Sequence, residues 1–218
     1  MYVDMLNPLN KGGEIVMDYF TADLHLGHKR INELAGRPFE SVEEMNETII
    51  KRWNQTVSKD DSVFVLGDIV MGNFKENIKL IELLNGNKYM VAGNHDRIFV
   101  GNTDYSKRRE EFVKAYQDVG FKIISDGPPC FYNGGYMLNR QMFKVKFNVS
   151  HFPYSGDSHD EDRYVDFRPE FVPYSPWLIH GHVHERWKVD GYQINVGVDV
   201  WDFTPVSLQQ IATIMRGR

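Results

Sequence analysis

Seven side chains of types that bind metal ions stand at short, repeated intervals in this sequence. They are Asp23, His25, Asp68, Asn94, His151, His182 and His184. Asp23 and His25 are two residues apart, as are His182 and His184, and in extended backbone residues i and i+2 point to the same side. Two carboxylates, four imidazoles and one amide are too many donors for one tetrahedral zinc. The set suits two divalent ions that share a bridging carboxylate.

The charge of such a centre indicates its substrate. Two divalent ions, two aspartates and a bridging hydroxide leave a net charge of about +1. A positive centre of this kind favours an anionic phosphoester over a neutral amide. The substrate predicted for this site is therefore a phosphoester.

The same side chains follow apolar runs of strand length. Five such runs end in Asp, Asn or His, at residues 14–20, 63–66, 89–92, 143–149 and 177–179. In an open α/β sheet, ligands bind outside the carboxyl ends of the strands. We expect the five endings to meet in one crevice.

Helices are predicted between the early strands. Apolar residues recur every three or four positions over 41–57, which begins with the capping-box spacing of Ser41 and Glu44, and further helices are expected at 74–85 and 106–119. The later sequence predicts antiparallel hairpins up to Val149, with a turn at Asn133, Gly134 and Gly135, and a strand pair at 192–200. We predict an α/β fold of two packed sheets with helices outside. No repeat or linker divides residues 1–218, so a single domain is expected.

Composition excludes several classes of protein. The chain is 42% hydrophobic and 25% charged, which is ordinary for a globular domain. It has no apolar run of about 20 residues, no cationic start followed by an apolar stretch, and one cysteine. These features predict a cytoplasmic protein without a membrane partner. A net charge of -5 disfavours binding to duplex nucleic acid.

The first residues raise a separate question. Residues 11–14 (KGGE) are compatible with a purine-rich ribosome-binding sequence in the DNA, and Met17 follows at a suitable spacing. One hypothesis is therefore that translation in the source starts at Met17 and that residues 1–16 are read-through. The rival is a genuine extension in which Ile15 and Val16 lengthen the first strand.

The motifs, taken in order, resemble those of a known family. Asp-Leu-His at 23–25, Gly-Asp at 67–68, Gly-Asn-His-Asp at 93–96, a lone histidine at 151 and Gly-His-Val-His at 181–184 are similar to the set found in calcineurin-like metallophosphoesterases. The stretches LGH, RPF, EMN, GNHD and NVGVD resemble a small subgroup of bacterial and phage phosphoesterases.

The resemblance implies a fold and a role for each residue. It implies a β-sandwich flanked by helices in a four-layer architecture. Asp68 would bridge the two metals, and a bridging hydroxide would be the nucleophile. The first metal would be held by Asp23, His25 and His184, and the second by Asn94, His151 and His182. His95 would be the general acid and Asp96 would orient it. The ions would be Mn, Fe, Zn, Co or Ni, and Mn is expected to support activity in vitro.

Four more residues are candidates for substrate binding: His28, Arg37, Arg97 and Tyr154. Each has a structural alternative, which is a helix cap for His28, a surface position for the arginines and loop packing for Tyr154. The polar segment 153–169 is expected to set specificity. His180, inside a strand run, is expected to be packed.

The leading prediction is a phosphodiesterase that acts on cyclic nucleotides or nucleic-acid ends, because no lid or long insertion is visible. A phosphomonoesterase, acting on proteins or nucleotides, is the nearest alternative. A non-catalytic protein that binds metal or nucleotide is the alternative of another class. Such a protein is expected to have lost a ligand or the acid, whereas Asp68, Asn94 and His95 are all present. Nothing in the sequence indicates an oligomeric state.

Overall fold

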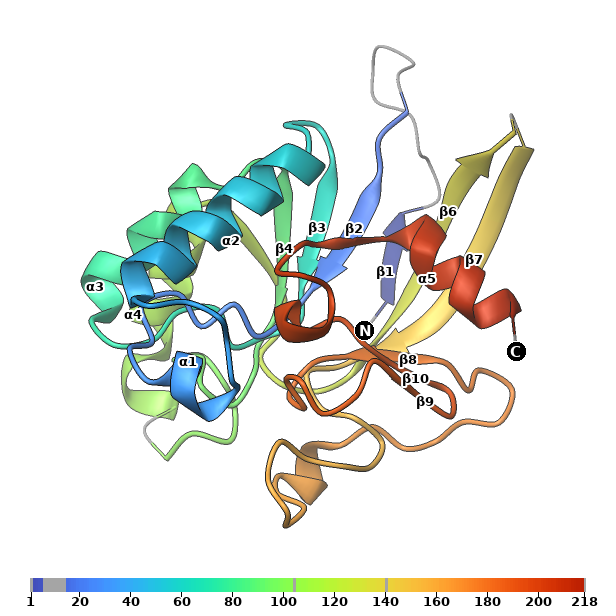
Figure 1. Cartoon of the computed structure of the whole chain (residues 1–218). Helices are drawn as coiled ribbons and strands as arrows, with labels where there is room; N and C mark the ends of the chain where they lie inside the picture. Colours follow the sequence, from blue (N-terminus) through green and yellow to red (C-terminus); the bar gives the residue numbers. More distant parts are fainter. Residues whose placement is uncertain (1, 6–14, 104, 140, 218) are drawn as a thin grey trace.

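Two β-sheets pack face to face in the computed structural model (Figure 1), which describes residues 2–5, 15–103, 105–139 and 141–217. Among these residues one sheet has five strands and the other six. Both sheets mix parallel and antiparallel pairs. The predicted α/β sandwich with flanking helices is confirmed.

The five-stranded sheet runs in the order β11-β2-β3-β4-β5. Its parallel strands are β2 (Asp18–Thr21), β3 (Ser62–Val65), β4 (Asn87–Val91) and β5 (Phe121–Ser125), and β11 (Val206–Ser207) pairs antiparallel with β2. All four residues of β3 are buried, because the sheet is covered on both faces.

The six-stranded sheet runs in the order β1-β6-β7-β8-β10-β9. Its strands are β1 (Tyr2–Met5), β6 (Cys130–Leu138), β7 (Gln141–Val149), β8 (Leu178–His180), β9 (Val189–Asp190) and β10 (Gln193–Asn195). β8 is parallel to both β7 and β10. The carboxyl ends of β7 and β8 therefore lie side by side.

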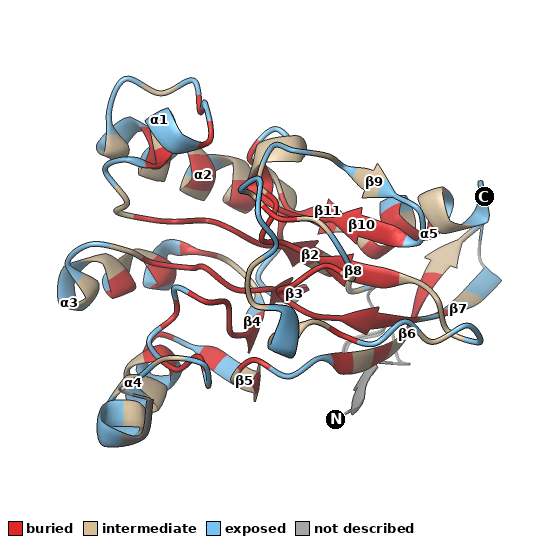
Figure 2. Ribbon diagram, turned by 90° about the horizontal axis from the view of Figure 1, so that it is seen from below, coloured by how far each residue is buried: buried red, intermediate tan, exposed pale blue. Residues whose placement is uncertain are grey.

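Helices cover the outer face of the five-stranded sheet. They are α1 (Ile31–Leu34), α2 (Val42–Thr56), α3 (Phe74–Asn77) with the 3-10 helix η1 (Ile78–Leu83), and α4 (Tyr105–Asp118). α2 begins as predicted, with the Ser41 side chain accepting a hydrogen bond from Glu44 N, and it buries Met45, Ile49 and Trp53 against the sheet. Figure 2 shows buried strands and helices whose outer faces are exposed.

Aromatic side chains fill the space between the sheets. Phe20 stacks on Phe64 at 5.0 Å and meets the edge of Tyr132 at 5.2 Å, and Tyr132 stacks on Phe147 at 4.8 Å. These pairs hold the two sheets together at their centres. The last helix, α5 (Leu208–Arg216), packs its apolar face against the same core and begins with a full capping box at Ser207.

The structure corrects one predicted turn and one predicted strand pair. Asn133, Gly134 and Gly135 lie inside β6 rather than in a turn, and the chain reverses between Leu138 and Gln141. Gly134 is needed for space, because a Cβ there would lie 2.0 Å from Tyr132 Oη. The strand pair predicted at 192–200 is also wrong in part. β10 ends at Asn195, and 198–200 form a 3-10 turn, η3 (Val198–Val200).

The other predicted elements are present with shifted ends. The five apolar runs coincide with β2, β3, β4, β7 and β8, although β2 begins only at Asp18. Neither Ile15 nor Val16 belongs to β2, and much of the segment invoked in the start-site hypothesis, 6–14, lies outside the described residues. No helix in the described part of the chain has the length and apolar content needed to cross a membrane.

Candidate metal centre

The seven ligand-type side chains come together at one edge of the sandwich. They follow the carboxyl ends of three strands of one sheet, β2, β3 and β4, and of two strands of the other, β7 and β8. Six of the seven have less than 10% of their surface exposed, and His184 is the exception. The predicted convergence of the strand ends is therefore present in the structure.

The backbone at this edge is strained. Asp23, His25, Asp68, His182 and His184 all have positive φ, between 49° and 72°. Non-glycine residues rarely adopt this left-handed conformation, and such strain is found mainly at functional sites. The paired residues thus do not reach a common point through extended backbone, as the spacing argument assumed. Sharp loops after β2, β3 and β8 bring them together.

Asp23, His25 and His184 form the first cluster. One ligand atom from each lies within 4.8 Å of the others, and the rings of His25 and His184 are 5.0 Å apart. Asp23 Oδ1 and both ring nitrogens of His25 are buried without a hydrogen-bond partner in the protein. Because buried polar atoms are normally paired, these three atoms fit a site built for a cation.

Asn94, His151 and His182 form the second cluster. Asn94 Oδ1 lies 3.0 Å from both His151 Nε2 and His182 Nδ1. The other nitrogen of each ring faces an acceptor, since His151 Nδ1 is 2.8 Å from Leu66 O and His182 Nε2 is 3.0 Å from Asp157 Oδ2. Those acceptors fix the protons on the far side of each ring, so the lone pairs face Asn94 Oδ1. Three lone-pair donors that converge in this way suit a second cation.

Asp68 lies between the two clusters. Its Oδ2 is 3.6 Å from His25 Nε2 in the first cluster and 3.6 Å from His151 Nε2 in the second. It also shares a possible ligand group with Asp23 and His151. This is the position that a bridging carboxylate must occupy.

Burial keeps these histidines neutral. It lowers the pKa of His182 to about 3 and that of His184 to about 4, and it lowers the pKa of His25 well below its usual value. Burial would raise the pKa of Asp68, but the nearby imidazoles of His151 and His95 hold it below the usual value. Neutral imidazoles and an ionised carboxylate are the forms that bind metals.

Asp96 supports the loops of the site and does not orient His95. Its carboxylate accepts hydrogen bonds from the backbone N–H groups of Gly93 and Asp68 at 2.8 Å, from Ile69 N at 3.2 Å and from Tyr116 Oη at 3.0 Å. The predicted catalytic role of Asp96 is therefore corrected to a structural one. It ties the loop after β3 to the loop after β4.

Glycines leave room for the crowded centre. A Cβ on Gly93 would lie 2.4 Å from Asp68 Oδ1, and one on Gly67 would lie 2.6 Å from His151 Nδ1. Gly67 also has φ +91°, whereas Gly93 does not have positive φ. At Gly93 the absence of a side chain, rather than freedom to turn, is what the site requires.

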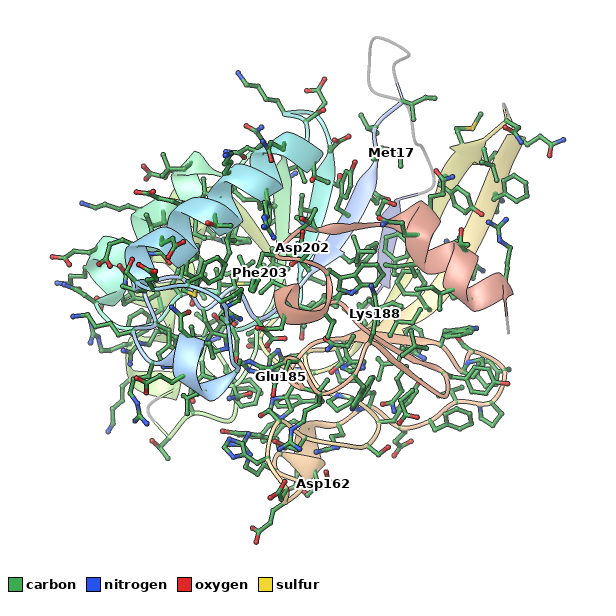
Figure 3. All side chains as sticks on the ribbon, viewed as in Figure 1. Met17, Asp162, Glu185, Lys188, Asp202 and Phe203 are labelled. Atoms are coloured by element: carbon green, nitrogen blue, oxygen red, sulfur yellow. The ribbon has the colours of Figure 1, made fainter. Side chains whose placement is uncertain are left out.

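A pocket of about 320 Å³ opens onto the two clusters. His95 and His28 both line it, and the His95 side chain is 43% exposed while its backbone N donates to Asp68 Oδ1 at 2.9 Å. The predicted specificity segment contributes Ser158, His159 and Arg163 to the wall. Figure 3 shows Glu185, another wall residue, close to α1, whereas Asp162 lies at the far tip of the segment.

Two predicted substrate contacts lie elsewhere. Arg37 is buried, and its guanidinium donates to Asp199, to the carbonyls of Asp23 and Leu24 and to Met45 Sδ, which occupies all five N–H groups. It has no donor left for a phosphate, so that prediction is wrong. Tyr154 packs in its loop, where its hydroxyl accepts from Asn148 Nδ2 at 3.1 Å.

The remaining predicted residues are placed as follows. Arg97 is exposed and lines a neighbouring cavity rather than the pocket over the clusters. His180 is fully buried, with its ring 4.7 Å from Trp187, as predicted. His159 is exposed.

Sequence reasoning missed two aspartates that support the ligands. Asp157 is buried and bonds His182 Nε2, while Arg163 donates to it at 2.8 Å. It lies in a charged stretch of the kind that is typical of a solvated loop, so nothing in its sequence indicated burial. Asp199 is 3.8 Å from His184 Nδ1 and pairs with Arg37. Its only signal in the sequence was its place in the NVGVD stretch.

Comparisons with known proteins agree with this geometry. Residues 19–186 match the sequence model of the calcineurin-like phosphoesterase family. The chain is 34% identical to the Gene 66 protein of Mycobacterium phage L5 over 84% of this chain and 86% of the phage protein. It is 30% identical to an uncharacterized protein of Methanocaldococcus jannaschii, over 90% of each chain.

A solved structure is also similar. The crystal structure of a protein of unknown function from Aquifex aeolicus aligns with a TM-score of 0.61 and 25% identity, covering 91% of this chain and 99% of that one. The five motifs predicted membership of this family and similarity to a small phage and bacterial subgroup. Both predictions are thus confirmed. On the family match and on relatives that align along most of their length, this chain belongs to the calcineurin-like phosphoesterase family.

Proposed function

We propose that the protein is a phosphodiesterase that uses two divalent metal ions. The observation that carries this proposal is that buried ligand atoms converge from five strand ends. In the first cluster, atoms of Asp23 and His25 have no hydrogen-bond partner in the protein. In the second, the ring nitrogens of His151 and His182 face Asn94 Oδ1. The first ion would be held by Asp23, His25 and His184, the second by Asn94, His151 and His182, and Asp68 would contact both. Family membership supports metal-dependent phosphoester hydrolysis in general.

When bound, the two ions would supply positive charge for the phosphoryl oxygens and would activate water near neutral pH. The donor set of nitrogen and oxygen atoms suits Mn, Fe, Zn, Co or Ni, and we propose Mn as the ion for assays. The chain's own groups hold the site in shape. Asp96 fixes two loops, and Leu66 O and Asp157 fix the rings of His151 and His182.

His95 is the proposed general acid. Its side chain is partly exposed beside Asp68, at 4.0 Å between Nε2 and Oδ2, yet it belongs to neither ligand cluster. A histidine in this place is able to give a proton to the oxygen of the leaving group. His28 is the proposed contact for a phosphate oxygen, because it lines the same pocket and its buried Nδ1 has no partner in the protein.

A diester is favoured over a monoester by the space around the site. The pocket over the clusters shares Met71, Asn94 and His95 with a second cavity of about 640 Å³. A phosphate at the clusters therefore has room for a substituent on either side. A monoester would leave one of these spaces unused.

The test is hydrolysis of bis(p-nitrophenyl) phosphate and of p-nitrophenyl phosphate by metal-stripped protein, with and without Mn. The proposal predicts Mn-dependent cleavage that favours the diester, and loss of it in both Asp68→Ala and His95→Ala. Preference for the monoester would identify a phosphomonoesterase instead. Binding of two ions without turnover of any phosphoester would indicate a binding protein.

A further inference from the structure

The larger cavity lies on the His95 side of the clusters. It has a volume of about 640 Å³, within the range of small-molecule sites, and none of the histidine or aspartate ligands lines it. Asn94 and His95 form part of its wall, so it continues directly from the pocket over the clusters. If His95 protonates the leaving oxygen, the leaving group must extend into this cavity.

The cavity is lined by cations. Arg97, Lys107 and Arg108 contribute to it, and no carboxylate is found among the described residues of its lining. Arg108 also pairs with Glu111, but both side chains are more than half exposed, so this pair is weak and open to exchange. The chain as a whole is acidic, so this concentration of positive charge is local.

The two arginines rest on an ordered aromatic base. The guanidinium carbons of Arg97 and Arg108 lie 5.9 Å and 4.8 Å from the centroid of the Phe112 ring. Phe112 meets the edge of Phe74 at 5.2 Å, and Phe74 in turn packs on Tyr116. Two like charges beside one ring repel each other, and an anion bound between them would offset this repulsion.

The base of the cavity is also tied to the candidate metal centre. Tyr116 Oη donates to Asp96 Oδ1 at 3.0 Å, and Asn102 Nδ2 donates to the carbonyl of Asp96 at 2.8 Å. Asp96 is the residue that fixes the loop carrying Asp68. The distance between the cationic cavity and the metal clusters is therefore set by direct contacts.

We propose that this cavity binds a second phosphate, carried by the leaving group of the substrate. The inference rests on the proposed function, because it takes His95 as the acid. Guanidinium groups pair well with phosphate, and a substrate of this kind is a nucleic-acid end or a phosphorylated dinucleotide. A cyclic mononucleotide has no second phosphate and would leave the cavity empty.

The experiment compares the dinucleotide TpT with TpTp and pTpT, using bis(p-nitrophenyl) phosphate as the reference. Cleavage of TpT leaves the scissile phosphate on one of the two products. The nucleoside released without that phosphate is the leaving half. An added phosphate on that half should raise kcat/KM about fivefold or more, and the gain should fall as salt is added. An added phosphate on the other half should change it less than about twofold.

Variants assign the effect to the cavity. Arg97→Ala should lower the gain from the added phosphate about fivefold, and Arg97→Lys, which keeps the charge, should restore part of it. Lys114→Ala is the matched control, because it removes a positive charge from α4, the helix that carries Lys107 and Arg108, at an exposed position that does not line the cavity. It should leave the gain unchanged.

The proposal and the proposed function fail in different ways. Equal cleavage of all three dinucleotides, or an equal loss in Arg97→Ala on every substrate, would overturn the second-phosphate site while leaving the phosphodiesterase intact. If no ester is cleaved, the proposed function fails. In that case the cavity is tested by the binding of thymidine 3′,5′-bisphosphate to metal-free protein. Arg97→Ala should weaken this binding, and an unchanged affinity would refute the site.

Discussion

Replacing Arg37 by methionine separates a structural role from a catalytic one. The guanidinium is buried and forms a two-pronged pair with Asp199, at 2.7 and 2.9 Å, and it also holds the carbonyls of Asp23 and Leu24. Methionine fills a similar volume but donates no hydrogen bond. The Asp199 side chain, 2% exposed, would then keep His184 Nδ1, at 3.8 Å, as its remaining ion-pair partner among the described residues.

The expected cost is large. Removing one partner of a buried ion pair costs about 3–5 kcal/mol, because the other charge is left without compensation. For a chain of this length each kcal/mol lowers Tm by roughly 2–4 °C. We therefore expect Arg37→Met to lower Tm by roughly 6–20 °C in metal-free protein. The double variant with Asp199→Asn should lose less than the sum of the two single variants.

The assay is thermal unfolding of metal-free protein followed by circular dichroism, which gives Tm, with urea unfolding to give the free energy of unfolding. The matched control is Arg52→Met, since Arg52 and Arg37 lie at similar distances from the Phe203 ring, 5.8 and 5.7 Å. Arg52 pairs with Asp202, which is 85% exposed in its side chain and is labelled beside Phe203 in Figure 3. Losing an exposed pair of this kind should cost less than about 1 kcal/mol. An Arg37→Met protein as stable as the control, with a raised KM, would refute the structural role.

Three further predictions concern groups outside the metal clusters or at their edge. Burial raises the pKa of Asp18 to about 6, above its unfolded value of 3.8, so the ionised form destabilises the folded state above pH 6 and this cost vanishes towards pH 4. Asp18→Asn should thus raise the free energy of unfolding by up to about 3 kcal/mol at pH 8 and change it little near pH 4. The measurement is urea unfolding at both pH values, and an equal change at pH 4 and pH 8 would contradict the argument. Asp157→Ala removes the acceptor from His182 Nε2 and should weaken Mn binding by about 10- to 100-fold by isothermal titration calorimetry, whereas unchanged affinity would show that Asp157 does not position the ring. Cys130 is buried, which raises its pKa to about 12, so Ellman's reagent at pH 8 should react with it only after unfolding, and rapid reaction of the native protein would be inconsistent with this burial.

The strand ends were predictable because each apolar run stops at a polar ligand type. The run at 63–66, for example, corresponds to β3, and Asp68 follows the run after one glycine, Gly67. A sheet aligns the carboxyl ends of its parallel strands, so the residues after them had to meet. The left-handed backbone at Asp23 and His182 was not predictable, because it is imposed by packing between loops rather than by the residues themselves.

Other errors came from reading local signals alone. Two glycines at 134 and 135 are a strong turn signal, yet here Gly134 makes room for the Tyr132 ring inside a strand. Asp96 follows His95 in the chain, but its side chain turns to the loop after β3. Arg37 belongs to a buried pair with Asp199, 162 residues away, and no local pattern could indicate so distant a partner. Long-range contacts of this kind exist only once the fold has formed.

The central claim is that Asp68 joins two metal ions into one centre. The most direct measurement is electron paramagnetic resonance of the protein during titration with Mn(II), for wild type and for Asp68→Asn. The account predicts an exchange-coupled spectrum that is complete at two ions per chain in the wild type and absent from the variant. A plain six-line spectrum that saturates at one ion per chain would contradict it.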